Sequence, residues 1–562
     1  MNLLKSIIIT LLAFISLKNT ASANPSLDWQ WALSATGTSK SIAVDASGNT
    51  YITGYFDSPT ITFGTSTLTK GGTESAFIAK YDVAGNLIWA RSSSGTGSAS
   101  GPGSAIQNGN SIAVDASGNS YIAGTFSGNT MSLDGTTLTN VGNAMSVDIF
   151  IAKYDAVGNL LWVKSAGGTS IDLAYGIAID PNGNAYITGS FSGPFIVLGS
   201  TALINSNPTG TDVFIAKYDT AGNLVWAKGA GGTDIEFGRS IAADASGNTY
   251  ITGYFSSPTL SFGTTILTNA GLEDIFIAKY DASGNFVWAK NAGGADHDYA
   301  FGIAADPNGN SYLTGFFESS TISFGATILT NSGGLDFFIA KYDTFGNPVW
   351  AKRAGGTADD GAFCIAADTS GNTYLTGFFG STISFGATTL TNSGGGDDFF
   401  TAKYDTSGNP VWAVNAGRLG TGQNRGSSIA VDANGCNSYI TGFFESSLIT
   451  FGATTLTKIG SDNMFTAKYG TNTTTAIIEN NTETKIAVYP NPNKGVFSVQ
   501  ISNFASQTFI IEVFNLVGES VYSGSITSDN TQIDLQSQPN GVYFFKLIGN
   551  KGVLKTGKVI VE

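Results

Sequence analysis

The feature that most constrains the fold of this chain is an internal repeat. The segment SIAVDASGNTYITGYF at Ser41 recurs as GIAIDPNGNAYITGSF at Gly176, as CIAADTSGNTYLTGFF at Cys364 and in further versions between and beyond them. One aspartate marks each copy, at intervals of 62–70 residues: Asp45, Asp115, Asp180, Asp244, Asp306, Asp368 and Asp432. A second block, as in DIFIAKYDASGNFVWAK at Asp274, follows each first block. Self-similarity at such a period predicts one supersecondary unit repeated seven times.

Each repeat contains four short segments rich in β-branched and aromatic residues, of the form IAVD, TYITGYF, FIAKYD and LVWAK. The sequence D-x-x-G-N joins the first pair and the last pair, and it favours a turn with glycine in the left-handed region that closes a bulged hairpin. Four antiparallel strands of this length form one propeller blade, so an all-β, seven-bladed β-propeller is predicted. An added F-G-x-T-x-L-T segment, such as FGTTILT at Phe262, predicts a small hairpin between the second and third strands.

The two ends of the repeat region complement each other. Six copies end in a tryptophan strand, at Trp89, Trp162, Trp226, Trp288, Trp350 and Trp412. The seventh copy stops at FTAKYGTNTTT, whereas the segment LDWQWALSATG at Leu27 carries a spare strand with Trp31. We therefore expect the N-terminal strand to be the outermost strand of the last blade, which closes the ring and removes an open strand edge. An open solenoid, the competing fold, would not explain this match.

Composition and charge exclude several classes of function. The 562 residues include 72 glycines, but 12% are aromatic, which argues against a disordered Gly-rich chain. The formal net charge of −14 provides no basic surface for nucleic acid. The two cysteines, Cys364 and Cys436, occupy different positions in their repeats, so we expect two free thiols rather than a disulfide.

The first residues predict export. Lys5 supplies a positive charge, Ile7 to Leu17 a short apolar run, and Ala21-Ser22-Ala23 a cleavage motif, so residues 1–23 are predicted to be a signal peptide cleaved after Ala23. The apolar run is too short to span a bilayer, and the mature chain has no predicted transmembrane segment.

The blocks IAVDASGNTYITG and FIAKYDASGNFVWAK resemble the SBBP family of bacterial β-propeller repeats. The resemblance covers roughly residues 27–470. It implies a propeller over residues 24–470 and an extracellular setting, and it carries no general catalytic assignment.

A polar linker, residues 471–485, precedes a different C-terminal segment, residues 486–562, whose alternating apolar residues predict a small Ig-like β-sandwich. Its YPNPNKGVF, NGVYFFK and KVIV motifs resemble the C-terminal sorting domain of type IX secretion in Bacteroidota. The resemblance implies passage through the outer membrane by the type IX machinery, followed by release or attachment at the cell surface.

The candidate ligand site lies where the repeats differ, in the segments GGTSIDLAYG, GGTDIEFGRS, GGADHDYAFG and GGTADDGAFC. These are expected to be loops around the mouth of the propeller channel. They contain seven acidic candidates: Asp172, Asp234, Glu236, Asp296, Asp298, Asp359 and Asp360. A ring of carboxylates could bind calcium or a cationic or hydroxyl-rich ligand, and a solvated acidic surface or loop capping is the alternative. No other cofactor is predicted. The lysines and turn aspartates shared by all repeats are predicted to be structural.

Catalysis is not expected. The chain has no G-x-S-x-G, H-E-x-x-H or P-loop motif, and its single histidine, His297, restricts a catalytic triad. The sequence thus favours an exported, non-enzymatic recognition or adhesion protein whose ligand is a glycan or a surface protein. A polysaccharide-processing enzyme with two rim carboxylates is the first alternative, although acids on a wet rim would lack the burial that raises a general acid's pKa. A self-assembling surface coat is the second.

Overall fold

The computed structural model describes residues 27–96, 105–142, 145–392, 394–460, 462–471, 486–501, 509–549 and 552–562. The predicted signal peptide and its cleavage position after Ala23 lie outside the described residues, as does the predicted linker apart from Thr471. The chain divides into two compact units, Met1–Asn472 and Thr473–Glu562. Every regular element in the described ranges is a β-strand. These ranges contain no helix long and apolar enough to cross a bilayer.

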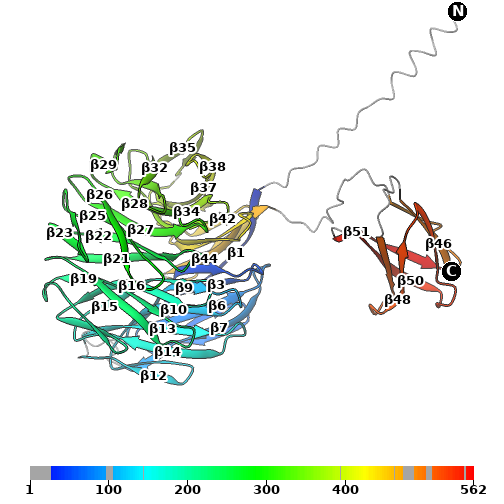
Figure 1. Ribbon diagram of the computed structural model, residues 1–562, viewed down its shortest axis with the longest axis horizontal. Coiled ribbons are helices and arrows are strands. Elements are labelled where there is room, and N and C mark those ends of the chain that lie inside the picture. The colour runs from blue at the N-terminus through cyan, green and yellow to red at the C-terminus, as the bar shows by residue number, and fades with distance from the viewer. Residues whose placement is uncertain are drawn as a thin grey trace, which may run out of the picture. The chain divides into compact units, whose positions relative to one another are not determined.

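The first unit is a succession of four-stranded antiparallel sheets, one for each sequence repeat (Figure 1). Its described residues form seven such sheets, which are, in strand order, β2 (Thr38–Val44), β3 (Thr50–Phe56), β6 (Ser75–Tyr81), β7 (Leu87–Ser92); β9 (Gln107–Val114), β10 (Ser120–Ser127), β13 (Val147–Tyr154), β14 (Leu160–Ala166); β15 (Asp172–Ile179), β16 (Ala185–Ser192), β19 (Thr211–Tyr218), β20 (Leu224–Ala230); β21 (Glu236–Ala243), β22 (Thr249–Phe255), β25 (Asp274–Tyr280), β26 (Phe286–Ala292); β27 (Asp298–Ala305), β28 (Ser311–Phe317), β31 (Asp336–Tyr342), β32 (Pro348–Ala354); β33 (Asp360–Ala367), β34 (Thr373–Phe379), β37 (Asp398–Tyr404), β38 (Pro410–Val414); and β40 (Asn424–Val431), β41 (Asn437–Phe444), β44 (Asn463–Thr471), β1 (Leu27–Thr36).

Neighbouring sheets share apolar cores. Ala178 and Tyr186 of the third sheet, for example, pack in one cluster with Ile241, Ile251 and Phe276 of the fourth. The first strands of successive sheets are in contact along the series, and β40 of the last sheet contacts β2 of the first. This all-β arrangement is consistent with a propeller-type repeat.

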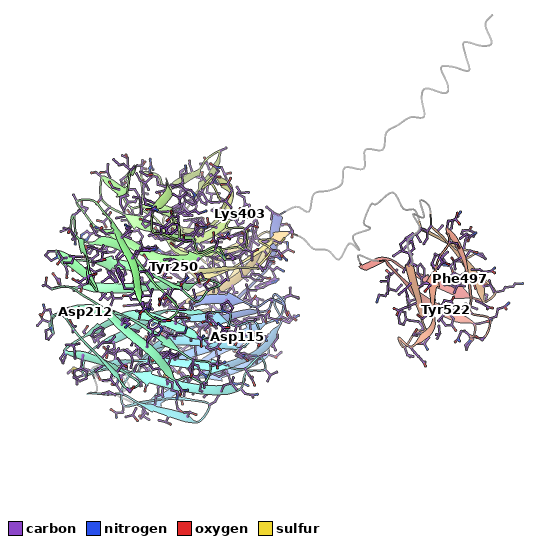
Figure 2. All side chains as sticks on the ribbon, in the orientation of Figure 1. Asp115, Asp212, Tyr250, Lys403, Phe497 and Tyr522 are labelled. Carbon is purple, nitrogen blue, oxygen red and sulfur yellow. The ribbon has the colours of Figure 1, made fainter. Side chains whose placement is uncertain are left out.

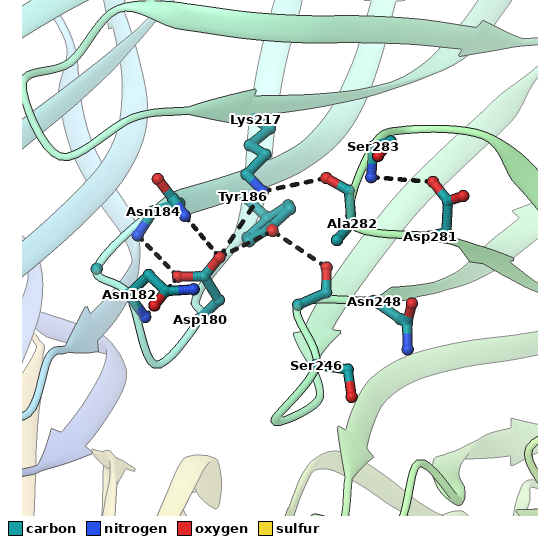
Figure 3. Close-up of polar contacts among 12 residues, drawn as sticks. Asp180, Asn182, Asn184, Tyr186, Lys217, Ser246, Asn248, Asp281, Ala282 and Ser283 are labelled. Carbon is teal, nitrogen blue, oxygen red and sulfur yellow. Dashed lines mark hydrogen bonds and ion pairs between the residues drawn. The ribbon is translucent and has the colours of Figure 1, made fainter.

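The repeated turn residues join one sheet to the next (Figure 3). Asp180 Oδ1 accepts hydrogen bonds from the backbone N–H groups of Asn182 (2.9 Å) and Asn184 (3.0 Å). The Tyr186 hydroxyl lies 3.0 Å from Asp180 Oδ2 and 3.1 Å from the Gly247 carbonyl oxygen in the following sheet. The D-x-x-G-N aspartate therefore holds its own turn together, as the sequence predicts.

The repeated lysine has a structural role as well. Lys217 Nζ donates to the Ala282 carbonyl oxygen (3.1 Å) in the next sheet and lies 4.8 Å from the centre of the Tyr186 ring. Its equivalents Lys80, Lys153 and Lys279 make the same pair of contacts. These contacts support the prediction that the repeated lysines are structural. Tyr250, which is labelled in Figure 2, is fully buried, and its hydroxyl contacts Asp244 Oδ2 and the Gly309 carbonyl oxygen, as that of Tyr186 does one sheet earlier.

The D-x-x-G-N turn between the third and fourth strands of a sheet is called the outer turn. Its glycine contacts the tryptophan of the preceding sheet. Gly222 has φ of 80°, and a Cβ there would lie 2.7 Å from the Trp162 ring. The Trp162 indole N–H donates to the Thr220 carbonyl oxygen in the same turn (3.1 Å). Only glycine tolerates both the conformation and the close approach, which accounts for the G-N pair in every outer turn.

The N-terminal strand β1 pairs with β44, the third strand of the last sheet (Figure 1). Trp31 lies opposite Lys468, the register that Trp89 has with Lys80 in the first sheet. The Trp31 indole N–H donates to the Val83 carbonyl oxygen of the first sheet (3.1 Å). The same bond to a carbonyl oxygen of the next sheet is made by Trp89, Trp162, Trp226, Trp288 and Trp350. Strand β1 thus supplies the outer strand that the seventh repeat lacks, as the sequence predicts.

Short hairpins follow the second strand of each repeat, and they confirm the prediction from the F-G-x-T-x-L-T segments. Buried Ile61 and Phe63 anchor the first of them to the core. The pairs are β4 (Thr60–Phe63) with β5 (Ser66–Thr69), β11 (Thr130–Leu133) with β12 (Thr136–Thr139), β17 (Phe195–Leu198) with β18 (Thr201–Ile204), β23 (Thr259–Phe262) with β24 (Thr265–Thr268), β29 (Thr321–Phe324) with β30 (Thr327–Thr330), β35 (Thr382–Phe385) with β36 (Thr388–Thr391), and β42 (Leu448–Phe451) with β43 (Thr454–Thr457). Strands β8 (Ser94–Thr96) and β39 (Gly417–Leu419) extend the β11 and β42 hairpins.

The second unit contains two antiparallel sheets around one core. Phe497 and Val499 of one sheet pack with Ile511, Val513 and Phe545 of the other. In strand order the sheets are β45 (Ile486–Tyr489), β46 (Val496–Ile501), β49 (Asn530–Asp534) and β48 (Ser520–Ile526), β47 (Phe509–Phe514), β50 (Gly541–Gly549), β51 (Gly552–Val561).

Candidate functional site

Four of the seven acidic candidates differ from their expected placement. The sequence pattern places them in exposed loops, but Asp172, Glu236, Asp298 and Asp360 are the first residues of β15, β21, β27 and β33, and all are fully buried. We call the first strand of each four-stranded sheet of the first unit its inner strand. The inner strands begin further upstream than the apolar IAVD segment of the sequence indicates. The acidic side chains are enclosed beneath the Gly-Gly turn that precedes each strand. These four therefore do not form a wet rim.

Each buried acid binds the turn that precedes it. Gly168 N–H donates to Asp172 Oδ2 (2.6 Å), and Gly356 N–H donates to Asp360 Oδ2 (2.6 Å). Two other repeats have neutral residues at the same position, Gln107 and Asn424, and these are also fully buried. A polar side chain that recurs there in most repeats, whether charged or neutral, indicates a structural role.

A second buried carboxylate lies near each of these four, on the third strand of the preceding sheet. Burial, with a smaller contribution from the charge of Asp148, raises the pKa of Asp172 to about 8. Burial raises the pKa of Asp148 itself to about 7. The Oδ1 atoms of both residues have no hydrogen-bond partner in the described part of the chain. Desolvation thus favours the protonated form of this pair.

The same pairing recurs at three further sheet-to-sheet contacts. Burial raises the pKa of Glu236 to about 7, of Asp298 to about 7, of Asp360 to about 7 and of Asp274 to about 6, and it also raises the pKa of Asp212 and Asp336. The partners are Asp212 for Glu236, Asp274 for Asp298 and Asp336 for Asp360. Asp212 is labelled in Figure 2.

The remaining acidic candidates, Asp234, Asp296 and Asp359, are exposed. His297 Nδ1 contacts Glu273 Oε2, and this contact raises the pKa of the imidazole. The described residues contain no group of three or more His, Cys, Asp or Glu side chains that could hold a metal ion. The two cysteines are free, as predicted.

The structure points instead to a pocket of about 500 Å³ lined by all seven inner strands. Each inner strand has a β-bulge, and the residue that the bulge skips lines the pocket. These residues are Lys40, Asn110, Tyr175, Arg239, Phe301, Phe363 and Ser427. A bulge redirects a side chain out of the alternating strand pattern, which is how seven strands present one residue each to a common space.

Glycine on the second strand accommodates the bulge. A Cβ at Gly189 would lie 1.8 Å from the Leu173 carbonyl oxygen, and one at Gly253 would lie 1.7 Å from that of Phe237. The strands approach too closely for any other residue, which explains the invariant glycine of the ITG and LTG motifs.

Cations and aromatic rings both line this pocket. The Arg239 guanidinium lies 4.3 Å from the centre of the Tyr175 ring and 5.0 Å from that of Phe301. Phe363 meets Phe301 edge to face, with centroids 5.6 Å apart. Lys40 is exposed to solvent within the pocket, but surrounding protein and the charge of Arg239 lower its pKa. Such a wall offers stacking faces and positive charge to a ligand.

The pocket residues carry a sequence signal. They stand five positions before the turn aspartate, between residues that scarcely vary from repeat to repeat, and they change from Lys to Asn, Tyr, Arg, Phe and Ser. A position that varies inside an otherwise uniform strand is where sevenfold repetition is broken, and it could have been found without the structure.

Comparison with protein families supports both resemblances. The model of the secretion system C-terminal sorting domain matches residues 487–562, and that of the SBBP β-propeller repeat matches residues 161–195 and 287–315. The chain carries SBBP β-propeller repeats and a type IX sorting domain. It is therefore a secreted repeat protein handled by the type IX secretion system, and it is located at the outer surface or outside the cell.

Two relatives found by sequence have low identity to this chain. The chain is 28% identical over 366 residues to the uncharacterized WD repeat-containing protein L264 of Acanthamoeba polyphaga mimivirus, covering 54% of this chain and 26% of that protein. It is 25% identical over 347 residues to the regulatory protein FlaEY of Caulobacter vibrioides, covering 58% of this chain and 34% of that protein. The chain thus matches only about a quarter to a third of these relatives' length. Sqt1 from Chaetomium thermophilum, a solved structure, has 10% identity and a TM-score of 0.35, with 77% of this chain and all of Sqt1 covered.

Proposed function

We propose that this protein is a non-enzymatic recognition or adhesion module whose ligand, a glycan, binds in the pocket formed by the seven bulge residues. The observation that carries the proposal is the convergence of Tyr175, Phe301 and Phe363 with Arg239 in one solvent-accessible space. Aromatic faces stack on sugar rings, and a few polar groups fix orientation. A surface protein is the other candidate ligand class.

The scaffold in this proposal is a seven-bladed propeller, residues 24–470, closed by β1 and followed by an Ig-like sandwich over residues 486–562. Support for closure comes from the contact of β40 with β2 and from the Trp31 bond to Val83, which both join the last sheet to the first. In such a ring the inner strands surround an axial channel, where their bulge residues face one another.

The burial of four acidic candidates favours binding over glycoside hydrolysis. A general acid must touch its substrate, but Asp172, Glu236, Asp298 and Asp360 have no exposed surface. Their raised pKa values follow from enclosure by protein rather than from a substrate cleft. A self-assembling coat predicts concentration-dependent light scattering, and the recognition module predicts none.

Replacing Phe363 with serine tests the pocket. Serine occupies the same position in the seventh repeat, at Ser427, so the strand and its bulge should remain intact. We expect glycan retention on a polysaccharide affinity panel to fall about fivefold or more, since loss of one stacking face removes roughly 1–3 kcal/mol. The control is Phe345→Ser, which removes an exposed ring from an outer turn and should leave retention unchanged. Equal retention by both variants would contradict the proposed site.

A further inference from the structure

The pocket contains two cations without a carboxylate partner. Lys40 of β2 and Arg239 of β21 both line it, and neither takes part in any ion pair of the described residues. The third cation of the pocket, Arg425, is paired with Asp397. Two positive charges therefore lie unneutralised in one space of a chain whose net charge is −14, and besides burial the charge of Arg239 lowers the pKa of Lys40.

Acidic groups near the pocket do not neutralise them. Glu74 is close enough to favour the charged form of Lys40 but makes no ion pair with it, and burial raises the pKa of Glu74. Glu445 and Asp462, which also line the pocket, are exposed to solvent. The space between Lys40 and Arg239 thus keeps its positive character.

The guanidinium of Arg239 is held by ring stacking rather than by a salt bridge. Tyr175 and Phe301 contact it at 4.3 Å and 5.0 Å, so its planar orientation is fixed while its charge is uncompensated. A planar guanidinium in this state matches the paired oxygens of a carboxylate or a sulfate group, which it binds with two parallel hydrogen bonds. The Phe301 and Phe363 rings beside it leave an apolar wall for the sugar that carries the group.

We propose that the pocket selects an anionic glycan, in which a carboxylate or sulfate group pairs with Arg239 and Lys40 while the sugar ring packs against Phe301 and Phe363. This inference rests on the proposed function and narrows it to a charge class. The acidic remainder of the protein would repel a polyanion, so binding is confined to the pocket and weakens as salt screens the two cations.

Two matched probe pairs test the inference on the chain without residues 1–23. Polygalacturonate is compared with its methyl ester, and dextran sulfate with dextran, by titration calorimetry at low and high salt. The expected result is that one charged polymer binds and its neutral counterpart binds at least about tenfold more weakly, as loss of a charge-assisted hydrogen bond implies. The pair that binds distinguishes carboxylate from sulfate.

Single substitutions of Arg239 and Lys40 test whether these two cations bind the anionic group of the ligand. Arg239→Gln and Lys40→Asn should each weaken binding of the charged probe about tenfold. Lys40→Asn places in β2 the residue that β9 already has at its bulge, Asn110. The control is Lys228→Gln, an exposed cation on the outer strand β20, which should not change affinity. If neutral polymers bind as well as charged ones, and Phe363→Ser abolishes both, the inference is wrong but the proposed function stands. If no charged probe binds, the inference is wrong, and if the whole panel is silent the proposed function fails too.

Discussion

We expect deletion of residues 24–34 to lower the melting temperature of the first unit by roughly 10 °C. The deletion removes most of β1 and leaves β44 as an open edge. Trp29, which is lost with it, packs edge to face on Phe451 (4.8 Å between centroids) and Tyr469 (5.0 Å). Burying about 150–250 Å² per tryptophan at about 25 cal/mol per Å² gives about 4–6 kcal/mol as an upper estimate.

The comparison variant is Trp31→Phe, which keeps an aromatic ring but loses the hydrogen bond to Val83. It should lower the free energy of unfolding by only about 1 kcal/mol, a shift of about 1 °C in melting temperature for a unit of this size, because one hydrogen bond is lost. Differential scanning calorimetry measures both variants. A melting temperature unchanged by the deletion would show that β1 does not close the last sheet.

Raising the pH from 5 to 9 also destabilises the first unit. In the folded state burial raises the pKa of Asp172 to about 8, and those of Asp148 and Glu236 to about 7, whereas an unfolded acid keeps its ordinary value. A group with a raised folded pKa contributes its full stability below the unfolded pKa, and this is lost as the pH rises through the folded pKa. The free energy of unfolding should therefore decrease between about pH 4 and pH 8, by about 1.4 kcal/mol for each unit by which folding raises the pKa of an acid.

Asp172→Asn isolates one member of this set. The amide has nearly the shape of a protonated carboxyl, and Asn424 already occupies the equivalent buried position. We expect a melting temperature close to wild type at pH 5 and above wild type at pH 9, because the variant has no buried charge to form. The exposed Asp234→Asn serves as the control and should follow wild type throughout. An equal shift at both pH values would mean that Asp172 does not hold a proton in the folded state.

The strands of the repeat could be located from the sequence because their apolar segments recur in every copy and are joined by D-x-x-G-N, a sequence with a known turn preference. Sequence reasoning also found the outer strand of the last sheet, since a tryptophan strand was missing at one end and spare at the other. It misjudged Asp172 and its equivalents because a strand that begins with a buried acid looks like a loop. Only the packing of the preceding Gly-Gly turn over that acid shows that it is enclosed.

The pocket was missed for a different reason. Lys40, Tyr175 and Arg239 break the in-and-out alternation of their strands, so the pattern gives no direction for their side chains. The bulge that turns them inward is visible only in the register of β2 with β3, or of β21 with β22. The pattern of charged residues also pointed elsewhere. Acidic residues are common in the variable segments, whereas the pocket cations are single residues within uniform strands.

The most direct test of the account passes the chain without residues 1–23 over a polysaccharide panel, with calcium or with chelator. Retention and newly formed reducing ends are measured together. We expect retention without new reducing ends, and we expect Phe363→Ser to lose that retention. The comparison of calcium with chelator tests whether calcium takes part in binding. New reducing ends that disappear when the exposed acids Asp234, Asp296 and Asp359 are changed to asparagine would contradict the account and establish an enzyme instead.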